Sequence, residues 1–329
     1  MPFLLPIAPL FMTAPVLAAH APLFVVFNPG SGRGTWAQTR QALEDGCKEA
    51  GRSLTLMPLK RGQSLDRVIT QAVQGALSTG GIAVAVGGDG TINAVAQQAV
   101  ARGCAFGVLP QGTFNYFSRA HGLPAPPDEA LAVLLAGRPQ AVQVGLVNDR
   151  VFLVNASLGF YARLLEEREV YKARYGRSRG VALLAAVLTL LRGSRLWDLQ
   201  ARWHGRTQTL RTPTLFVGNN PLQFEQVGVE HGEAVEQGEL AAVALKPLGR
   251  AAMLGLLFQA ALGRLDKASE VLSLSFRDLE VAAPHAPRGQ RVRVAADGEL
   301  QWMQMPLRFR VSPKPLWLVK PAFLERERA

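Results

Sequence analysis

In the first 140 residues, short apolar runs alternate with longer stretches in which Ala, Leu and Val recur at helical spacing. The apolar runs lie at 23–27, 54–57, 82–86 and 106–109, and the stretches between them at 36–50, 64–78 and 92–102. Buried strands read as continuous apolar runs, whereas one-sided helices repeat their apolar residues every three or four positions. This alternation predicts β-α-β-α-β units and therefore a parallel sheet covered by helices.

The pattern changes after Pro139. Short β-prone runs separated by turns follow, at 151–154, 199–203, 215–217, 240–245, 279–281 and 291–294. They predict a second, antiparallel and β-rich domain, with helices at about 163–192 and 249–263. Two domains are the natural expectation for 329 residues.

A glycine-rich turn, Gly87-Gly88-Asp89-Gly90-Thr91, directly follows the apolar run 82–86. Glycines allow close approach of a phosphate to the backbone, and the helix that begins here offers unpaired N–H groups. Asp89 would repel a phosphate unless a cation such as Mg²⁺ lay between them. The turn therefore indicates a metal–nucleotide complex.

Two further loops of this kind follow neighbouring runs. Asn28-Pro29-Gly30-Ser31-Gly32 comes after 23–27, and Pro110-Gln111-Gly112-Thr113-Phe114-Asn115 comes after 106–109. Ligands of open α/β sheets bind at the carboxyl ends of the strands, so the three loops are expected to meet at one site.

These three loops, with Asp297-Gly298-Glu299 far downstream, resemble in order and spacing the motifs of the diacylglycerol kinase catalytic-domain family. The likeness extends from about residue 22 to about 321. The family includes sphingosine, ceramide and bacterial lipid kinases. The resemblance implies an α/β N-terminal domain like those of NAD kinase and diacylglycerol kinase, and a β-sandwich-like C-terminal domain. It also implies a lipid-phosphorylating role in phospholipid metabolism, with ATP and Mg²⁺ as cofactors.

The predicted domain organisation follows from the pattern and the resemblance. Residues 22–142 form the nucleotide-binding catalytic domain and residues 143–311 the β-rich lipid-substrate domain. Residues 312–329 return to the first domain. Residues 1–21 are an apolar leader, and Met12 is an alternative start.

The resemblance also assigns candidate site residues. Asp297 is the expected general base with Glu299 beside it, and Asp89 is the expected Mg²⁺ ligand and the second candidate for the base. The expected nucleotide-binding residues are Asn28, Ser31, Gly88, Gly90, Thr91, Thr113 and Asn115. Structural explanations stay open: the glycines could form a plain turn, the Asn residues could cap helices, and Asp297-Gly298 could join two strands.

The sequence departs from the family pattern in three places. Tyr116 follows Asn115 where an aspartate is common. Glu236-Gln237-Gly238 replaces an Asp-Asp-Gly turn, with Ala241 at a nearby acidic position, so a second, structural Mg²⁺ site is not expected. Leu59, Lys60 and Arg61 stand where the family usually has a nucleotide-contacting threonine.

Charge is concentrated in the second domain. The net charge is +11, and residues 163–211 carry 11 Lys and Arg against four acidic residues, beside the apolar run 181–191. Basic residues next to an apolar helix suit an anionic membrane surface, although a solvated basic face over a core helix is an equal alternative. The run is too short to span a bilayer, and no nucleic-acid-binding motif is present.

The compartment is predicted to be reducing. Cys47 and Cys104 are the only cysteines, without disulfide or metal spacing. The leader 1–21 has no Lys or Arg and contains four prolines, which argues against a signal peptide. Attachment to the membrane surface and export are the alternative roles for this leader. The expected location is cytoplasmic, at the inner face of the membrane.

Other function classes compete with a lipid kinase. NAD kinase shares the Gly-Gly-Asp-Gly turn. A Rossmann oxidoreductase is disfavoured because Gly30, Gly32 and Gly34 lack the required spacing. A catalytically silent lipid- or nucleotide-binding regulator remains possible because of Tyr116 and the altered turn at 236–238.

Overall fold

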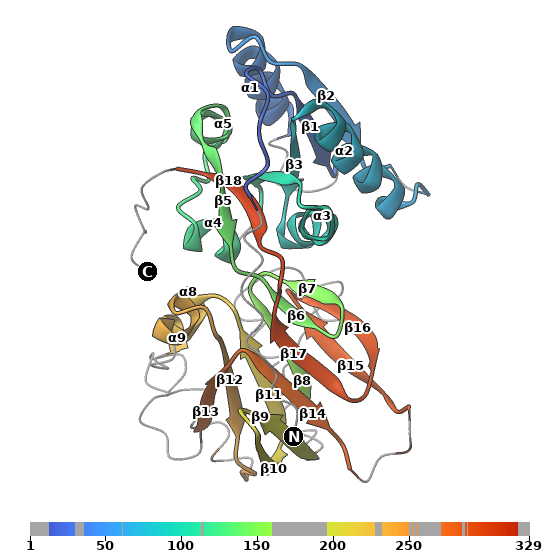
Figure 1. The fold of residues 1–329 in the computed structure, drawn as a ribbon, viewed down its shortest axis with the longest axis vertical. Coiled ribbons are helices and arrows are strands. Elements are labelled where there is room, and N and C mark those ends of the chain that lie inside the picture. Colours follow the sequence, from blue (N-terminus) through green and yellow to red (C-terminus); the bar gives the residue numbers. More distant parts are fainter. Residues whose placement is uncertain are drawn as a thin grey trace.

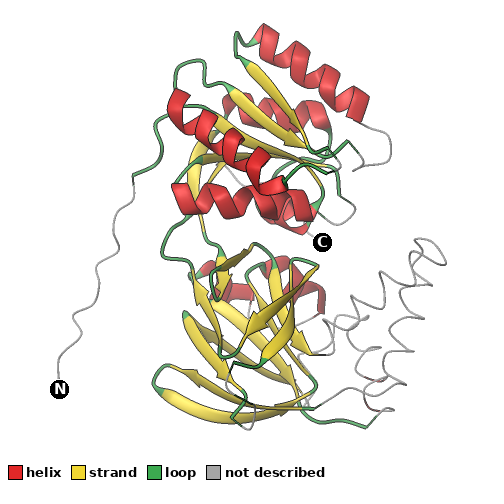
Figure 2. Ribbon diagram, turned by 90° about the vertical axis from the view of Figure 1, so that its right-hand side faces the viewer, coloured by secondary structure: helices red, strands yellow, loops and turns green. Residues whose placement is uncertain are grey.

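The computed structural model of the chain has two stacked parts (Figure 1). The structure describes residues 13–29, 36–60, 62–112, 115–159, 196–227, 232–249, 252, 255, 271–284, 287 and 289–321. An α/β part occupies one end and a part made mostly of strands occupies the other (Figure 2).

The first part contains a six-stranded sheet in the order β2-β1-β3-β4-β18-β5. All neighbouring pairs are parallel except β18 and β5. The strands are β1 Leu23–Phe27, β2 Leu54–Pro58, β3 Ile82–Gly87, β4 Ala105–Pro110, β5 Arg138–Val142 and β18 Leu316–Lys320. The helices are α1 Trp36–Glu49, α2 Leu65–Thr79, α3 Asp89–Arg102, α4 Tyr116–Ala120 and α5 Pro127–Ala136.

Alternate residues of the central strands face opposite layers. Ala83 and Ala85 of β3 belong to one core cluster with α2 and α3. Ile82 and Val84 of the same strand belong to another cluster with α1 and α5. Because successive side chains of a strand point to opposite faces, both faces of the sheet are covered by helices, as predicted for a parallel sheet.

The second part contains two six-stranded antiparallel sheets, in the orders β10-β9-β14-β17-β6-β7 and β13-β12-β11-β8-β15-β16. Their strands are β6 Gly145–Val147, β7 Arg150–Phe152, β8 Asn155–Gly159, β9 Trp197–Trp203, β10 Arg206–Thr212, β11 Thr214–Gly218, β12 Leu240–Leu245, β13 Val271–Phe276, β14 Asp278–Ala282, β15 Arg291–Ala296, β16 Glu299–Gln304 and β17 Leu307–Val311. Both sheets contribute to one core, which contains Leu199 and Phe309 from the first and Leu215 and Val294 from the second. This is a sandwich arrangement, and the predicted fold class is confirmed.

Two short helices, α8 Pro221–Val227 and α9 Gly232–Glu236, lie beside this second part. The helices predicted at 163–192 and 249–263 lie outside the described residues, apart from 252 and 255. Among the residues that the structure describes, no helix is both long and apolar enough to cross a bilayer.

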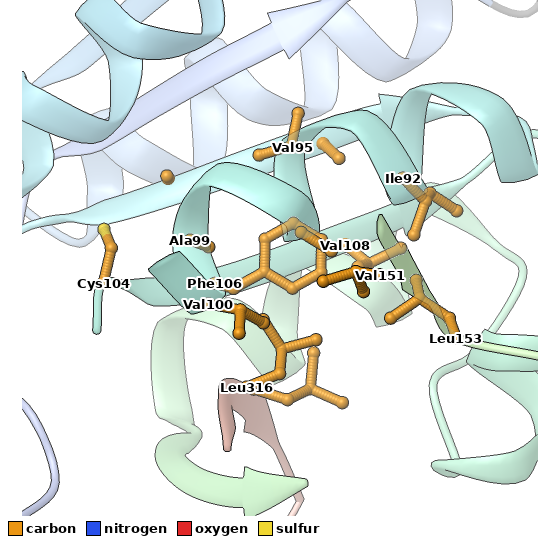
Figure 3. Close-up of a cluster of buried hydrophobic side chains, with 14 of the residues drawn as sticks. Ile92, Val95, Ala99, Val100, Cys104, Phe106, Val108, Val151, Leu153 and Leu316 are labelled. Atoms are coloured by element: carbon orange, nitrogen blue, oxygen red, sulfur yellow. The ribbon is translucent and has the colours of Figure 1, made fainter. Parts of the chain in front are cut away.

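Helix α3 packs against both parts of the molecule. Ile92, Val95 and Val100 of α3 share a core cluster with Phe106 of β4 and with Leu153, which follows β7 (Figure 3). The start of the second part is therefore built into the core of the first. This packing fixes the position of the residues that join the two parts.

Candidate functional site

The three glycine loops begin at the same edge of the parallel sheet. Phe27 of β1 is level with Val86 of β3, and Val86 is level with Leu109 of β4. The exposed Asn28 follows β1 directly, and the backbone N–H of Gln111 donates to the carbonyl of Gly87 over 2.8 Å. Ser31 and Thr113 lie outside the described residues.

The second and third loops touch through their glycines. A Cβ added to Gly112 would lie 3.4 Å from the Cα of Gly88 and 2.6 Å from Oδ1 of Asn115. Asn115 has a left-handed backbone (φ 48°), and its buried Oδ1 has no hydrogen-bond partner in the part of the chain that the structure describes. The two loops are therefore in van der Waals contact at their glycines.

Asp89 is the first residue of α3, immediately after Gly88. Its Oδ1 is buried and has no hydrogen-bond partner among the described residues, and burial raises the pKa of this carboxyl. Gly90 and Thr91 complete the first turn, where helix N–H groups have no partner within the helix. An unpartnered buried carboxylate oxygen is costly, which marks this position as prepared for a ligand.

Asp297 has a very different environment, although it lies nearby. It sits in the turn between β15 and β16 with a left-handed backbone (φ 47°). Its Oδ2 accepts hydrogen bonds from the N–H of Leu153 (2.7 Å) and from Nδ2 of Asn93 (2.6 Å). Its Oδ1 accepts from the N–H of Val154 (2.9 Å) and the N–H of Asn155 (3.0 Å).

These contacts favour a positioning role for Asp297. Burial raises the pKa of Asp297, while the four hydrogen bonds oppose that rise by favouring the carboxylate. Both oxygens are already occupied by donors. Asp297 therefore ties the segment that enters the second part to helix α3.

Glu299 approaches the glycine turn from the second part. Its Oε1 lies 2.9 Å from the position that a Cβ on Gly90 would take. Its Oε2 lies 3.3 Å from Nη2 of Arg150, in an ion pair whose side chains are 31% exposed for Arg150 and 50% for Glu299. The turns around residues 89 and 298, more than 200 positions apart, thus form one site.

Two residues of this site were missed by the sequence analysis. Asn93 donates to the carbonyl of Val151 (3.1 Å) as well as to Asp297. Gln97 accepts from the N–H of Val151 (2.7 Å) and donates to the carbonyl of Asp149 (3.3 Å). Both lie on one face of α3, four residues apart. An Asn and a Gln four residues apart in this helix were the available signal.

A pocket of about 190 Å³ opens on another side of the junction, next to Leu153. Asn219, Asn220 and Gln143 line it. Asn219 exchanges hydrogen bonds with Gln143 and donates to the carbonyl of Leu153, and Asn220 donates to the carbonyl of Tyr116. These amides therefore hold the two parts together.

The altered motifs can also be located. Tyr116 begins α4. Glu236 ends α9, Gly238 has a left-handed backbone (φ 85°), and Ala241 is buried in β12. Lys60 is exposed, and Arg61 lies outside the described residues.

The described residues offer two carboxylates that could bind Mg²⁺ together with phosphate oxygens. Among the described residues there is no group of three or more His, Cys, Asp or Glu side chains that could hold a metal. Mg²⁺ in kinases is commonly held by one or two carboxylates together with substrate phosphates. Asp89, with its unpartnered oxygen, and Glu299 on the other side of Gly90 are such carboxylates.

Comparison with known proteins agrees with this geometry. The family model of the diacylglycerol kinase catalytic domain matches residues 22–147. The resemblance indicated by the sequence motifs is confirmed.

A probable lipid kinase YegS-like of Pseudomonas aeruginosa (strain UCBPP-PA14) is 38% identical over 121 residues, which are 36% of this chain and 38% of that protein. Its counterpart in Serratia proteamaculans (strain 568) is 32% identical over 162 residues, 47% of this chain and 51% of that protein. The matched part thus spans about a third to a half of these relatives.

Solved structures extend the likeness to nearly the whole fold. A putative diacylglycerol kinase from Bacillus anthracis str. Sterne superimposes with a TM-score of 0.69, covering 92% of this chain and 98% of its own, at 16% identity. A second diacylglycerol kinase structure from the same organism gives a TM-score of 0.66 at 15% identity. At this identity the likeness concerns the fold.

Proposed function

We propose that this chain is an ATP-dependent lipid kinase that uses Mg²⁺ to transfer the γ-phosphoryl group to the hydroxyl of a diacylglycerol-like lipid. The observation that carries the proposal is the buried, unpartnered Oδ1 of Asp89 at the start of α3. It lies in a glycine turn that contacts a second glycine loop. The family match and the lipid-kinase names of the relatives support the same chemistry.

The glycine loops are the proposed phosphate site. Phosphoryl transfer depends mostly on positioning and charge stabilisation. Gly88, Gly90 and Thr91 offer backbone N–H groups at a helix start. The other proposed nucleotide-binding residues are Asn28, Ser31, Thr113 and Asn115.

Asp89 and Glu299 would hold Mg²⁺ at this site. When bound, the ion neutralises charge on the phosphates. In the transfer, the bond from the γ-phosphorus to the ADP oxygen breaks and a bond to the lipid oxygen forms. The hydroxyl proton passes to a carboxylate.

Of the two candidates for that carboxylate, Asp89 is favoured over Asp297. Asp89 would bind the ion through its unpartnered Oδ1 and accept the proton on its other oxygen, whereas both oxygens of Asp297 accept hydrogen bonds. A proton acceptor needs a free lone pair within reach of the hydroxyl. Asp297 then supports the reaction by holding the two parts of the molecule in register.

The proposed lipid acceptor places the enzyme at the cytoplasmic face of a membrane. The net charge of +11 favours anionic headgroups. A catalytically silent regulator is the second candidate, and Tyr116 in the third motif is the feature that favours it. A regulator would bind Mg·ATP without transferring phosphate.

The test is incubation of the purified protein with radiolabelled ATP, Mg²⁺ and a bacterial lipid extract, followed by chromatography of the organic phase. D89A and D297A are the test variants, and D45A, at an exposed aspartate of α1, is the matched control. We expect a labelled lipid with the wild type and D45A and almost none with the other two. ATP binding without any labelled lipid would favour the regulator, and no ATP binding would refute both functions.

A further inference from the structure

We propose that Gln111 is a positioning residue that couples the three glycine loops and so fixes the site for the nucleotide phosphates. Gln111 belongs to the third loop and is half-buried. The inference rests on the proposed function and adds to it a residue that acts on the nucleotide through the loops and not by contact with the reacting atoms.

Gln111 makes two hydrogen bonds, which lead to the regions of the other two loops. Its backbone N–H donates to the carbonyl of Gly87, the first residue of the second loop, over 2.8 Å. Its side-chain Nε2 donates to Oγ1 of Thr39 over 3.0 Å. Thr39 lies in α1, the helix after the first loop. One residue of the third loop is therefore tied both to the second loop and to the helix that follows the first.

The start of α1 is also fixed to strand β1. Trp36, the first residue of α1, stacks on Phe27, the last residue of β1, with 3.7 Å between the ring centres and 11° between the ring planes. Trp36 and Thr39 are three positions apart, and residues at this spacing are neighbours on a helix surface. The first turn of α1 is thus held from β1 through Trp36 and from the loop after β4 through Gln111.

These contacts span the middle of the candidate site. Strand β3 lies between β1 and β4 in the sheet, and it leads directly into Gly88 and Asp89. Thr39 is only 1% exposed, so water does not readily replace Gln111 as the donor to its hydroxyl. A buried polar group that loses its partner is costly, which favours one position for the side chain of Gln111.

Coupled loops lower the cost of nucleotide binding. Ordering a loop during binding costs free energy, and contacts that fix the loop beforehand avoid this cost. Backbone N–H groups bind a phosphate well only when several of them point at the same ligand. Gly88 and Gly112 already bring the second and third loops into contact, and Gln111 adds the connection to α1. Loss of the hydrogen bond to Thr39 should therefore weaken nucleotide binding and leave the transfer step itself unchanged.

The experiment measures the Kd for Mg·ATP by calorimetry with the full chain. The test variants are Q111M, which keeps the length of the side chain and removes its amide, and T39V, which removes the hydroxyl. T39S is the conservative variant, because it keeps the hydroxyl. Thermal melts check that all variants are folded.

Q140M is the matched control. Gln140 of β5 is also half-buried, and its Nε2 donates to the carbonyls of Lys320 (3.3 Å) and Pro321 (2.9 Å). It is level with Leu318, which is level with Phe106 near the start of β4. Gln140 therefore lies toward the end of the sheet opposite to the glycine loops, and Q140M removes the same amide at a place where the nucleotide is not expected.

We expect Q111M and T39V each to raise the Kd for Mg·ATP about two- to tenfold, the range for one hydrogen bond. Since both changes remove the same bond, the double variant should bind no more weakly than the weaker single variant. T39S and Q140M should bind as the wild type does. The KM for ATP should rise with the Kd, while kcat and the KM for lipid stay nearly unchanged. Unchanged binding by Q111M, an equal loss in Q140M, or additive losses in the double variant would overturn the proposal.

Hydrogen exchange of the nucleotide-free protein separates this proposal from the kinase function. In Q111M the amides at the start of α1, in the turn at 87–91 and at 110–112 should exchange several-fold faster than in Q140M, while those of α2 exchange equally. If no protein binds Mg·ATP but exchange still follows Gln111, the kinase function fails and the coupling of the loops stands. Binding of Mg·ATP with equal exchange in the two variants would leave the kinase function standing and refute the coupling.

Discussion

Nδ2 of Asn93 donates to Oδ2 of Asp297 over 2.6 Å, across 204 positions of the chain. Asn93 belongs to α3 of the first part and is 3% exposed, while Asp297 belongs to the second part. The same carboxylate accepts three consecutive backbone N–H groups from residues 153–155. One side chain thus joins a helix, a crossing segment and a hairpin turn, beside the place where Glu299 approaches Gly90.

The first prediction concerns D297N. Each oxygen of this carboxylate accepts from two donors, so the amide NH₂ of asparagine would face two donors and leave them unpaired. Each buried unpaired group costs about 1–3 kcal/mol. We expect the free energy of unfolding in urea to fall by at least that amount, with a large loss of kinase activity.

D89N is the matched comparison. It removes charge from a carboxylate whose buried oxygen has no partner, so the free energy of unfolding should be unchanged or slightly higher. Activity should still be lost because the proposed proton acceptor is gone. Equal destabilisation by D89N and D297N would contradict the different roles assigned to the two aspartates.

The apolar pattern was sufficient to predict the parallel sheet and the mainly antiparallel second part. The runs at 23–27 and 82–86 became β1 and β3 because each is continuously apolar and buried. Strand β10, by contrast, was not predicted. Its Arg206–Thr212 segment is polar and mostly exposed, since it lies at the edge of its sheet and contributes little to the core. Edge strands of this kind lack the periodicity on which sequence prediction depends.

The candidate site was predictable only where a local motif exists. Asp89, Gly88 and Asn115 are marked by glycine turns, and the sheet edge brings these turns together. The role of Asp297 was not predictable because its partners at residues 93 and 153–155 are distant in sequence, and three of them are backbone groups. The assignment of Asp297 as general base stays an untested prediction, and its hydrogen bonds favour a positioning role.

The second prediction concerns the two thiols. Cys47 and Cys104 are 2% and 1% exposed. Burial raises the pKa of both, and the pKa of Cys104 rises to about 11. Below that pH the Cys104 thiol is protonated, and only the thiolate is an effective nucleophile. At pH 8 a thiol reagent should modify neither residue of the native protein and both in denaturant, as counted by mass spectrometry. Rapid native labelling at pH 8 would show that one thiol is accessible.

The third prediction concerns Arg150, which is paired with Glu299 at 3.3 Å. Because both side chains are partly exposed, the ion pair should contribute only about 0–1 kcal/mol to stability. R150Q should therefore unfold at nearly the wild-type urea concentration. Its turnover should fall several-fold, because Glu299 then loses the partner that orients it beside Gly90. E280Q is the control, since it removes another surface ion pair, with Arg308, away from the site. A loss of stability without a change in turnover would refute the role of Glu299.

The fourth prediction separates a phosphate-binding glycine from a structural one. Gly88 has an extended backbone (φ −83°, ψ −179°). A Cβ there would meet only the Cα of Gly112, at an ordinary 3.8 Å. G88A should therefore fold with wild-type stability, yet its methyl group would project into the space proposed for the phosphates. We expect the Kd for Mg·ATP, measured by calorimetry, to rise at least tenfold, equivalent to about 1.4 kcal/mol.

G145A is the opposite case, because a Cβ at Gly145 would overlap the ring of the buried Phe152. Overpacking of a core typically costs about 1–3 kcal/mol. G145A should lose stability and, at temperatures where it remains folded, bind Mg·ATP as the wild type does. Unchanged binding in a stable G88A protein would mean that the turn at residues 87–91 is only a structural turn, and the proposed phosphate site would have to be abandoned.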